Sequence, residues 1–190
     1  MNLHWKTWLS FVVASACVTA HAQTNPISGK VESKLVLTSG CAINAGGSSG
    51  SVGASNFGTL DFGSQPSGFT GSLRSAANGS GSSGAAQITC SPDVTAVQVT
   101  VDAGLNGGKG ASVGAGTRAL GASGGGYVPY EVYADKGSTT QYVSGTAQTI
   151  PVPTPGTAFD LPIYGVANKT SMSALAAGTY TDELNVTLGW

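Results

Sequence analysis

The sequence predicts an all-β protein, built as an antiparallel β-sandwich in one exported domain. Apolar and polar residues alternate with a period of two along much of the chain, whereas no stretch sustains the three- and four-residue spacing of an amphipathic helix. The alternating runs are separated by segments rich in glycine and serine, which cannot build a core. About six or seven short strands with such turns between them are typical of a sandwich, and a closed barrel is the structural alternative.

The first 22 residues have the features of a secretory signal peptide. Lys6 precedes an apolar run from Trp8 to Val18, and the small residues Ala20 and Ala22 follow it at the spacing of a cleavage site. The run is much shorter than the roughly 20 residues of a membrane-spanning helix. Cleavage after Ala22 removes 22 of the 190 residues and leaves 168, enough for one domain with its own core. We expect an exported, soluble protein.

Cleavage also removes both histidines and leaves two cysteines, Cys41 and Cys90. An even pair in an exported chain favours one disulfide over two buried free thiols. The bridge would close a loop of about 50 residues, which the chain-entropy model values at about 4 kcal/mol. Without Lys6 the chain has seven basic residues (8 less 1) against nine acidic ones, and they are scattered. Nucleic acid and anionic membrane are therefore not expected as partners.

Seven runs carry the strand pattern. The first, 25–38, is longer than the typical strand of about five or six residues. In another, Val97, Val99 and Val101 alternate with polar residues, which predicts one buried and one solvated face. The six runs after the first are 56–63, 85–90, 96–104, 127–135, 158–166 and 179–190.

An enzyme would need chemistry that this sequence does not offer. With no histidine after cleavage, Ser-His-Asp and Cys-His arrangements and histidine-based zinc sites are excluded. The carboxylates Glu131, Asp135, Asp182 and Glu183 could form an acid pair for glycoside hydrolysis, but Asp182 and Glu183 are adjacent on a predicted strand and so point to opposite faces. The segment 104–112 lacks the glycine interval of a phosphate loop. No catalytic, cofactor or metal site is expected.

The two ends of the chain carry the strongest functional signal. The first run has an apolar face of four residues: Ile27, Val31, Leu35 and Leu37. The last run has an apolar face that continues to the final residue: Tyr180, Leu184, Val186, Leu188 and Trp190. A terminal strand with one neighbour leaves unpaired backbone groups, and a surplus strand from another copy can pair with them. Such an exchange would build a polymer.

Six short motifs in order resemble a known family. They are "TSGC", "FGTLDFG", "ITCS", "PYEVYAD", "LPIYGV" and "GTYTDELNVTL". Together with both cysteines, over residues 29–190, they resemble the pattern of spore coat protein U domains. That family includes the subunits of Csu-type, archaic chaperone-usher pili.

The resemblance implies an incomplete immunoglobulin-like sandwich that lacks its last strand and leaves an apolar groove open. A periplasmic chaperone would fill this groove first, and the N-terminal segment of a neighbouring subunit would replace it at an outer-membrane usher. Ile27, Val31, Leu35 and Leu37 would then be the donor residues, and the last run, with its carboxylate held by chaperone cations, would line the groove. Cys41 and Cys90 would form the family disulfide.

We therefore expect a signal peptide over 1–22, a donor segment over 23–38 and a pilin sandwich over 39–190. The expected function is that of a structural pilin in a surface pilus that supports adhesion and biofilm formation. Two alternatives remain open: a monomeric secreted β-sandwich that binds a ligand, and a structural protein of a spore or cyst coat.

Overall fold

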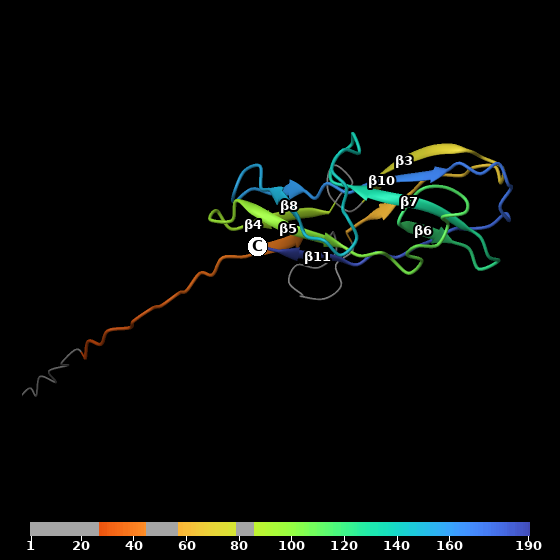
Figure 1. Ribbon diagram of the computed structural model, residues 1–190. Coiled ribbons are helices and arrows are strands. Elements are labelled where there is room, and N and C mark those ends of the chain that lie inside the picture. Colours follow the sequence, from red (N-terminus) through yellow and green to blue (C-terminus); the bar gives the residue numbers. More distant parts are fainter. Residues whose placement is uncertain (1–26, 45–56, 79–85) are drawn as a thin grey trace, which may run out of the picture. The chain divides into compact units, whose positions relative to one another are not determined.

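The computed structural model of this chain describes residues 27–44, 57–78 and 86–190, and these residues form eleven strands and no helix (Figure 1). The chain divides into two units, Met1–Val36 and Leu37–Trp190. The predicted signal peptide and the glycine-rich segment 46–53 of the sequence lie outside the described residues. No helix able to cross a membrane occurs in the described part of the chain.

The second unit contains three antiparallel sheets. The five-stranded sheet has the order β2 (Thr59–Leu60), β3 (Gly71–Asn78), β10 (Tyr164–Lys169), β7 (Tyr127–Tyr133) and β6 (Arg118–Gly121). One three-stranded sheet has the order β11 (Val186–Gly189), β5 (Ala96–Val101) and β8 (Gln148–Pro151). The other has the order β1 (Cys41–Asn44), β4 (Gln87–Cys90) and β9 (Phe159–Asp160).

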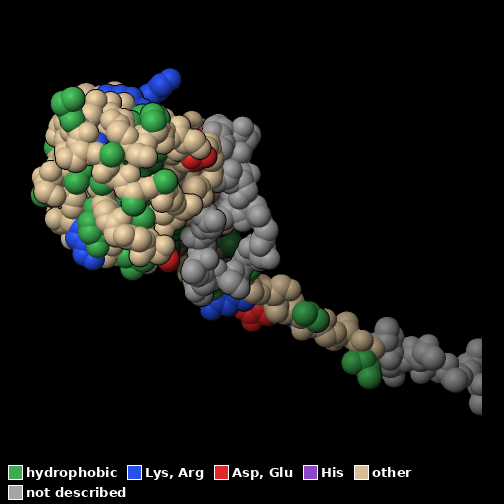
Figure 2. All heavy atoms as spheres, turned by 90° about the vertical axis from the view of Figure 1, so that its right-hand side faces the viewer, with side chains coloured by type: hydrophobic (Ala, Val, Ile, Leu, Met, Phe, Trp, Pro, Cys, Tyr) green, Lys and Arg blue, Asp and Glu red, His purple; other side chains and the backbone are tan. Residues whose placement is uncertain are grey.

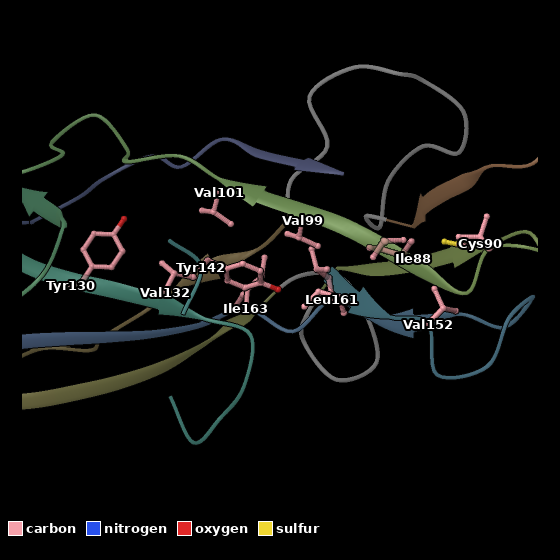
Figure 3. Close-up of a cluster of buried hydrophobic side chains, with 14 of the residues drawn as sticks. Ile88, Cys90, Val99, Val101, Tyr130, Val132, Tyr142, Val152, Leu161 and Ile163 are labelled. Atoms are coloured by element: carbon pink, nitrogen blue, oxygen red, sulfur yellow. The ribbon is translucent and has the colours of Figure 1, made fainter. Parts of the chain in front are cut away.

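One hydrophobic cluster joins these sheets. Val97, Val99 and Val101 of β5 are fully buried, as the alternation predicted. Figure 3 shows Val99 and Val101 pointing into the same cluster as Val132 of β7 and Ile88 of β4. The sheets therefore cover one another across a shared core, and the prediction of an antiparallel β-sandwich is confirmed.

The beginning of the second unit is fastened by the disulfide between Cys41 and Cys90, which the sequence predicted. The two cysteines lie opposite each other in the pairing of β1 with β4. Just before β1, Gly40 N–H donates to Ser91 Oγ at 2.7 Å, and Ser91 N–H donates to Gly40 O at 2.8 Å. The chain is thus held to β4 from about Gly40 onward.

A buried arginine, which no sequence pattern indicated, ties three elements together. The Arg118 side chain on β6 is fully buried and donates to the carbonyl oxygens of Asp102 at 2.8 Å and Tyr142 at 2.9 Å. It also pairs with Glu131 of β7 at 3.2 Å. A buried charge is tolerated when it is paired and its donors are satisfied, and the guanidinium meets both conditions.

The structure has more strands than the sequence predicted. β1, β3, β6 and β8 were not anticipated, because each has too few large apolar residues at alternate positions. The run 158–166 is not one strand but two, β9 and β10, which are separated by Leu161–Pro162–Ile163. Proline offers no N–H to a ladder, which accounts for a break there.

Replacing Arg118 by alanine should lower the free energy of unfolding by about 3–5 kcal/mol. The carbonyl groups of Val101, Asp102 and Tyr142 would lose a buried donor, and the Glu131 carboxylate would lose its partner. The matched control is Arg74→Ala, which removes an exposed arginine of β3 and should change stability by about 0.5 kcal/mol or less. Denaturant unfolding of the purified variants measures both values. Equal stability of the two variants would contradict this account of Arg118.

Candidate functional site

A groove of about 710 Å³ opens between two edges of the second unit. One wall is the segment 57–62, which contains β2, and the other is 180–187, which leads into β11. β2 ends the five-stranded sheet and β11 ends a three-stranded sheet. Much of the lining is apolar and contacts the core: Phe57, Leu60, Phe62, Leu120, Tyr130 and Ile163.

The first wall can approach the sheet closely because Gly165 of β10 has no side chain. A Cβ at this position would lie 2.8 Å from Cζ of Phe62 and 3.0 Å from Cδ1 of Leu60, both closer than ordinary contact. The Phe62 ring also packs against Tyr130, with ring centroids 6.1 Å apart and planes inclined by 60°. The aromatic residues of this wall thus form part of the groove surface.

The second wall ends in a strand with a free edge. β11 pairs with β5, and its other side faces no strand in the described part of the chain. Asp102 N–H donates to Asn185 O at 3.1 Å, so odd-numbered residues here turn their backbone groups toward β5. The even-numbered residues Leu184, Val186 and Leu188 then direct theirs to the free edge, while their half-buried side chains pack against the core.

Hydrogen bonds hold the second wall in place at several points. Thr181 exchanges two backbone hydrogen bonds with Gly121 of β6, each 2.9 Å long. Asp182 accepts from the hydroxyl of Tyr130 at 2.8 Å and from the N–H of Leu105 at 2.9 Å. This wall is therefore positioned independently of any partner that occupies the groove.

Asn185 adds a further attachment through a carboxylate whose pKa is shifted. The Asn185 side chain donates to Asp102 Oδ2 at 2.7 Å, and its backbone N–H donates to Oδ1 at 3.0 Å. Partial burial acts to raise the pKa of Asp102, but the bonds from Asn185 and Gly104 and the charge of Arg118 outweigh it. The pKa of this carboxyl consequently lies below its ordinary value of 3.8.

Tyr130 remains a neutral donor at the groove. Burial raises the pKa of its hydroxyl far above the ordinary value of 10.0, and the hydrogen bond to Asp182 raises it further. The hydroxyl therefore carries its proton at every physiological pH.

The segment that precedes the sandwich exposes its apolar side chains. Ile27 is 100% exposed, Val31 93% and Leu35 81%, and Leu37, at the start of the second unit, is 84% exposed. Residues 27–40 belong to no strand, so the described part of the strand predicted over 25–38 is unpaired in this single chain. Figure 2 shows hydrophobic side chains projecting from the extended chain, next to lysine and glutamate.

The five apolar residues predicted to line the groove from the last strand do not all lie in it. Tyr180, Leu184 and Val186 line the groove. Leu188 packs against the core but is not part of the groove lining, and Trp190 is 60% exposed. The contribution of 57–62 to the lining was missed, and the aromatic residues of "FGTLDFG" were the signal that could have indicated it.

The four carboxylates considered for catalysis serve separate contacts. Glu131 pairs with Arg118, and Asp135 accepts from the N–H groups of Thr139 and Thr140 in its own turn. Asp182 is bonded to Tyr130, whereas the neighbouring Glu183 is exposed. Among the residues that the structure describes, no three His, Cys, Asp or Glu side chains lie close enough to hold a metal ion.

Comparisons with known proteins place the sequence in a recognised group. The sequence profile described as Spore Coat Protein U domain matches residues 27–187. No curated protein matches the chain. Among solved structures, the chain is similar to the CsuC–CsuE chaperone-tip adhesion subunit pre-assembly complex from archaic chaperone-usher Csu pili of Acinetobacter baumannii, at 18% identity and a TM-score of 0.44. The similarity covers 81% of this chain and 40% of that chain. This chain therefore spans less than half of the length of the chain that it matches.

Replacing Asp102 by asparagine should loosen the second wall, because the neutral amide cannot accept both bonds from Asn185. We expect a loss of about 1 kcal/mol at pH 7, after allowance for solvent screening. Since the folded pKa is depressed, this stabilisation is present above pH 3.8 and is lost as the pH falls through the lower folded value.

The measurement is the melting temperature of both proteins between pH 7 and pH 2. The difference between wild type and Asp102→Asn should shrink toward zero at the acid end. The control is Asp61→Asn, an exposed residue that bonds locally to Gly63 N–H at 2.8 Å. A wild-type advantage that is constant over the whole range would show that the charge of Asp102 does not hold this wall.

Proposed function

Since the chain belongs to the Spore Coat Protein U domain family, we propose that it is a structural subunit of a chaperone-usher surface pilus, polymerising by donor-strand complementation. One observation carries this proposal: the same chain has an exposed apolar segment and an open apolar groove beside a free strand edge. Each feature is unfavourable in water by itself. Donation of the segment of one copy to the groove of the next would bury both.

The strand order supports this pairing. A donated strand alongside β11 would extend the sheet to four strands in the order donor, β11, β5 and β8. The backbone groups of Leu184, Val186 and Leu188 would provide the ladder, and Ile27, Val31 and Leu35 would face the groove.

The energy available is large enough to hold a fibre together. Burial of Ile27, Val31, Leu35 and Leu37 is worth roughly 1.5–3 kcal/mol for each residue, or on the order of 6–12 kcal/mol before the cost of ordering the segment. Backbone hydrogen bonds would add to this sum. The total is comparable to the stability of a whole domain.

The proposal specifies partners and location. A periplasmic chaperone would cover the groove before assembly, and an outer-membrane usher would exchange it for the segment of a neighbouring subunit. Residues 1–22 would direct export, 23–38 would be donated and 39–190 would form the sandwich. The resulting pilus at the cell surface would support adhesion and biofilm formation.

The name of the family supports one alternative, a structural protein of a spore or cyst coat. The same donated strand would operate in such a coat, and the location of the polymer would distinguish the two settings. A monomeric binding module, by contrast, would need no exchange of strands between copies.

Replacing Val31 and Leu35 together by aspartate should abolish polymerisation, because two charges would enter an apolar groove. The expected loss is at least about 3–6 kcal/mol, or more than a hundredfold in the stability of the junction. Because both side chains are exposed in the single chain, the fold of the monomer should not change. Sedimentation of material sheared from the cell surface measures the polymer.

The matched control is Val143→Asp with Met172→Asp, since these apolar side chains are also exposed, at 54% and 88%, but do not line the groove. The control should sediment as polymer. Polymer from the Val31/Leu35 variant would refute the proposal, and wild-type protein that sediments as a monomer would favour the binding module.

A further inference from the structure

The second wall of the groove, 180–187, has one charged side chain on its outer, solvent-exposed face. Four groove-lining residues of this wall are exposed: Thr181, Glu183, Asn185 and Thr187. Glu183 is the one charged residue among these four, and no lysine or arginine is part of the described lining of the groove. The outer face of the wall is therefore locally acidic.

The proposed donor segment has a matching row of charges. Its polar face contains Ser28, Lys30, Glu32 and Lys34, so positive, negative and positive charges follow at steps of two residues. The opposite face has large apolar residues at Ile27, Val31 and Leu35, with Gly29 and Ser33 between them. The lysines on one face and the large apolar residues on the other thus both recur every four residues.

A donated strand must choose a register along the free edge of β11. Residues that face the same way lie opposite each other in a paired ladder, so an outward residue of the donor lies opposite Glu183. A slip by two residues keeps every side chain on its own face, and alternation alone does not prevent it. Such a slip would exchange a lysine opposite Glu183 for Glu32, and like charges directly opposite are destabilising.

We propose that Glu183 selects the register of the donated strand by pairing with Lys30 or Lys34 of the neighbouring copy. This inference rests on the proposed function and adds a specificity-determining residue to it. It holds for either strand direction, because Lys30 and Lys34 lie two residues on each side of Glu32. Glu183 thereby excludes the register in which Glu32 would lie opposite it.

The inner face agrees with this choice. In the antiparallel register that brings Lys34 opposite Glu183, Val31 lies opposite Val186. In the same register, small donor residues lie opposite leucines: Gly29 opposite Leu188 of β11 and Ser33 opposite Leu184 of the second wall. Alternation of small and large side chains lets facing residues interdigitate, so this register suits both faces of the donor over residues 29–34.

The test uses full-length chains expressed from the native locus, with the polymers purified and their dissociation half-lives measured in denaturant at low salt. The variants are Glu183→Lys, the double variant Lys30→Glu with Lys34→Glu, and the combination of all three. Each of the first two should shorten the half-life about fivefold, because an attractive cross-strand pair becomes repulsive. The combination should restore it, and the differences should fade at about 1 M salt.

Two controls separate charge pairing from other effects. Lys136→Glu reverses one charge, as Glu183→Lys does, but at an exposed site outside the groove lining and the donor segment, and should leave the half-life within about twofold of wild type. Glu183→Gln removes the charge without reversing it and should have an intermediate half-life. Melting temperatures of the monomers check that each variant folds.

The outcomes distinguish this inference from the function on which it rests. Polymers of wild-type half-life from every variant, or a combination that does not restore the half-life, would overturn the role of Glu183 and leave the polymer itself established. Absence of polymer from cells that express the wild-type chain would overturn both proposals.

Discussion

The edge of β11 that faces no strand in the described part of the chain lies beside an apolar groove, and the proposed function depends on this feature. An open strand edge and exposed apolar surface both favour pairing with another strand. The bonds that fix the wall, from Thr181 to Gly121, from Tyr130 to Asp182 and from Asn185 to Asp102, hold the groove in position before any partner arrives. Less ordering is then required when a strand binds, which strengthens the junction.

The remainder of the sandwich supports this edge. The buried side chain of Arg118 connects β6 to the end of β5 and to Tyr142, so the two sheets that flank the groove are tied together from within. The disulfide and the bonds of Gly40 fasten the chain to β4 where the sandwich begins. Residues 27–40 belong to no strand, and in the proposed assembly this segment pairs with a neighbouring copy.

The alternation of apolar residues and the number of cysteines predicted the fold class and the disulfide correctly. They did not predict the contacts between residues that lie far apart in the sequence. Strict alternation identified β5, and the even number of cysteines predicted the pair Cys41 and Cys90. β3 was missed because Leu73 is its one large apolar residue, and it is a strand because β2 and β10 pair with its two edges. The first groove wall, 57–62, and the buried Lys169, whose Nζ donates to Phe69 O at 2.9 Å, likewise depend on partners far away in the sequence.

The most direct test of the account is a denaturing gel of surface material from the native cell, with unboiled and boiled samples side by side, probed for this protein. The account predicts a ladder of polymers without boiling that collapses on boiling to one band near the mass of a single mature chain. A donated strand that completes a neighbouring sandwich would resist detergent until heat unfolds it. A single monomer band in both lanes would contradict the account and favour a self-contained sandwich.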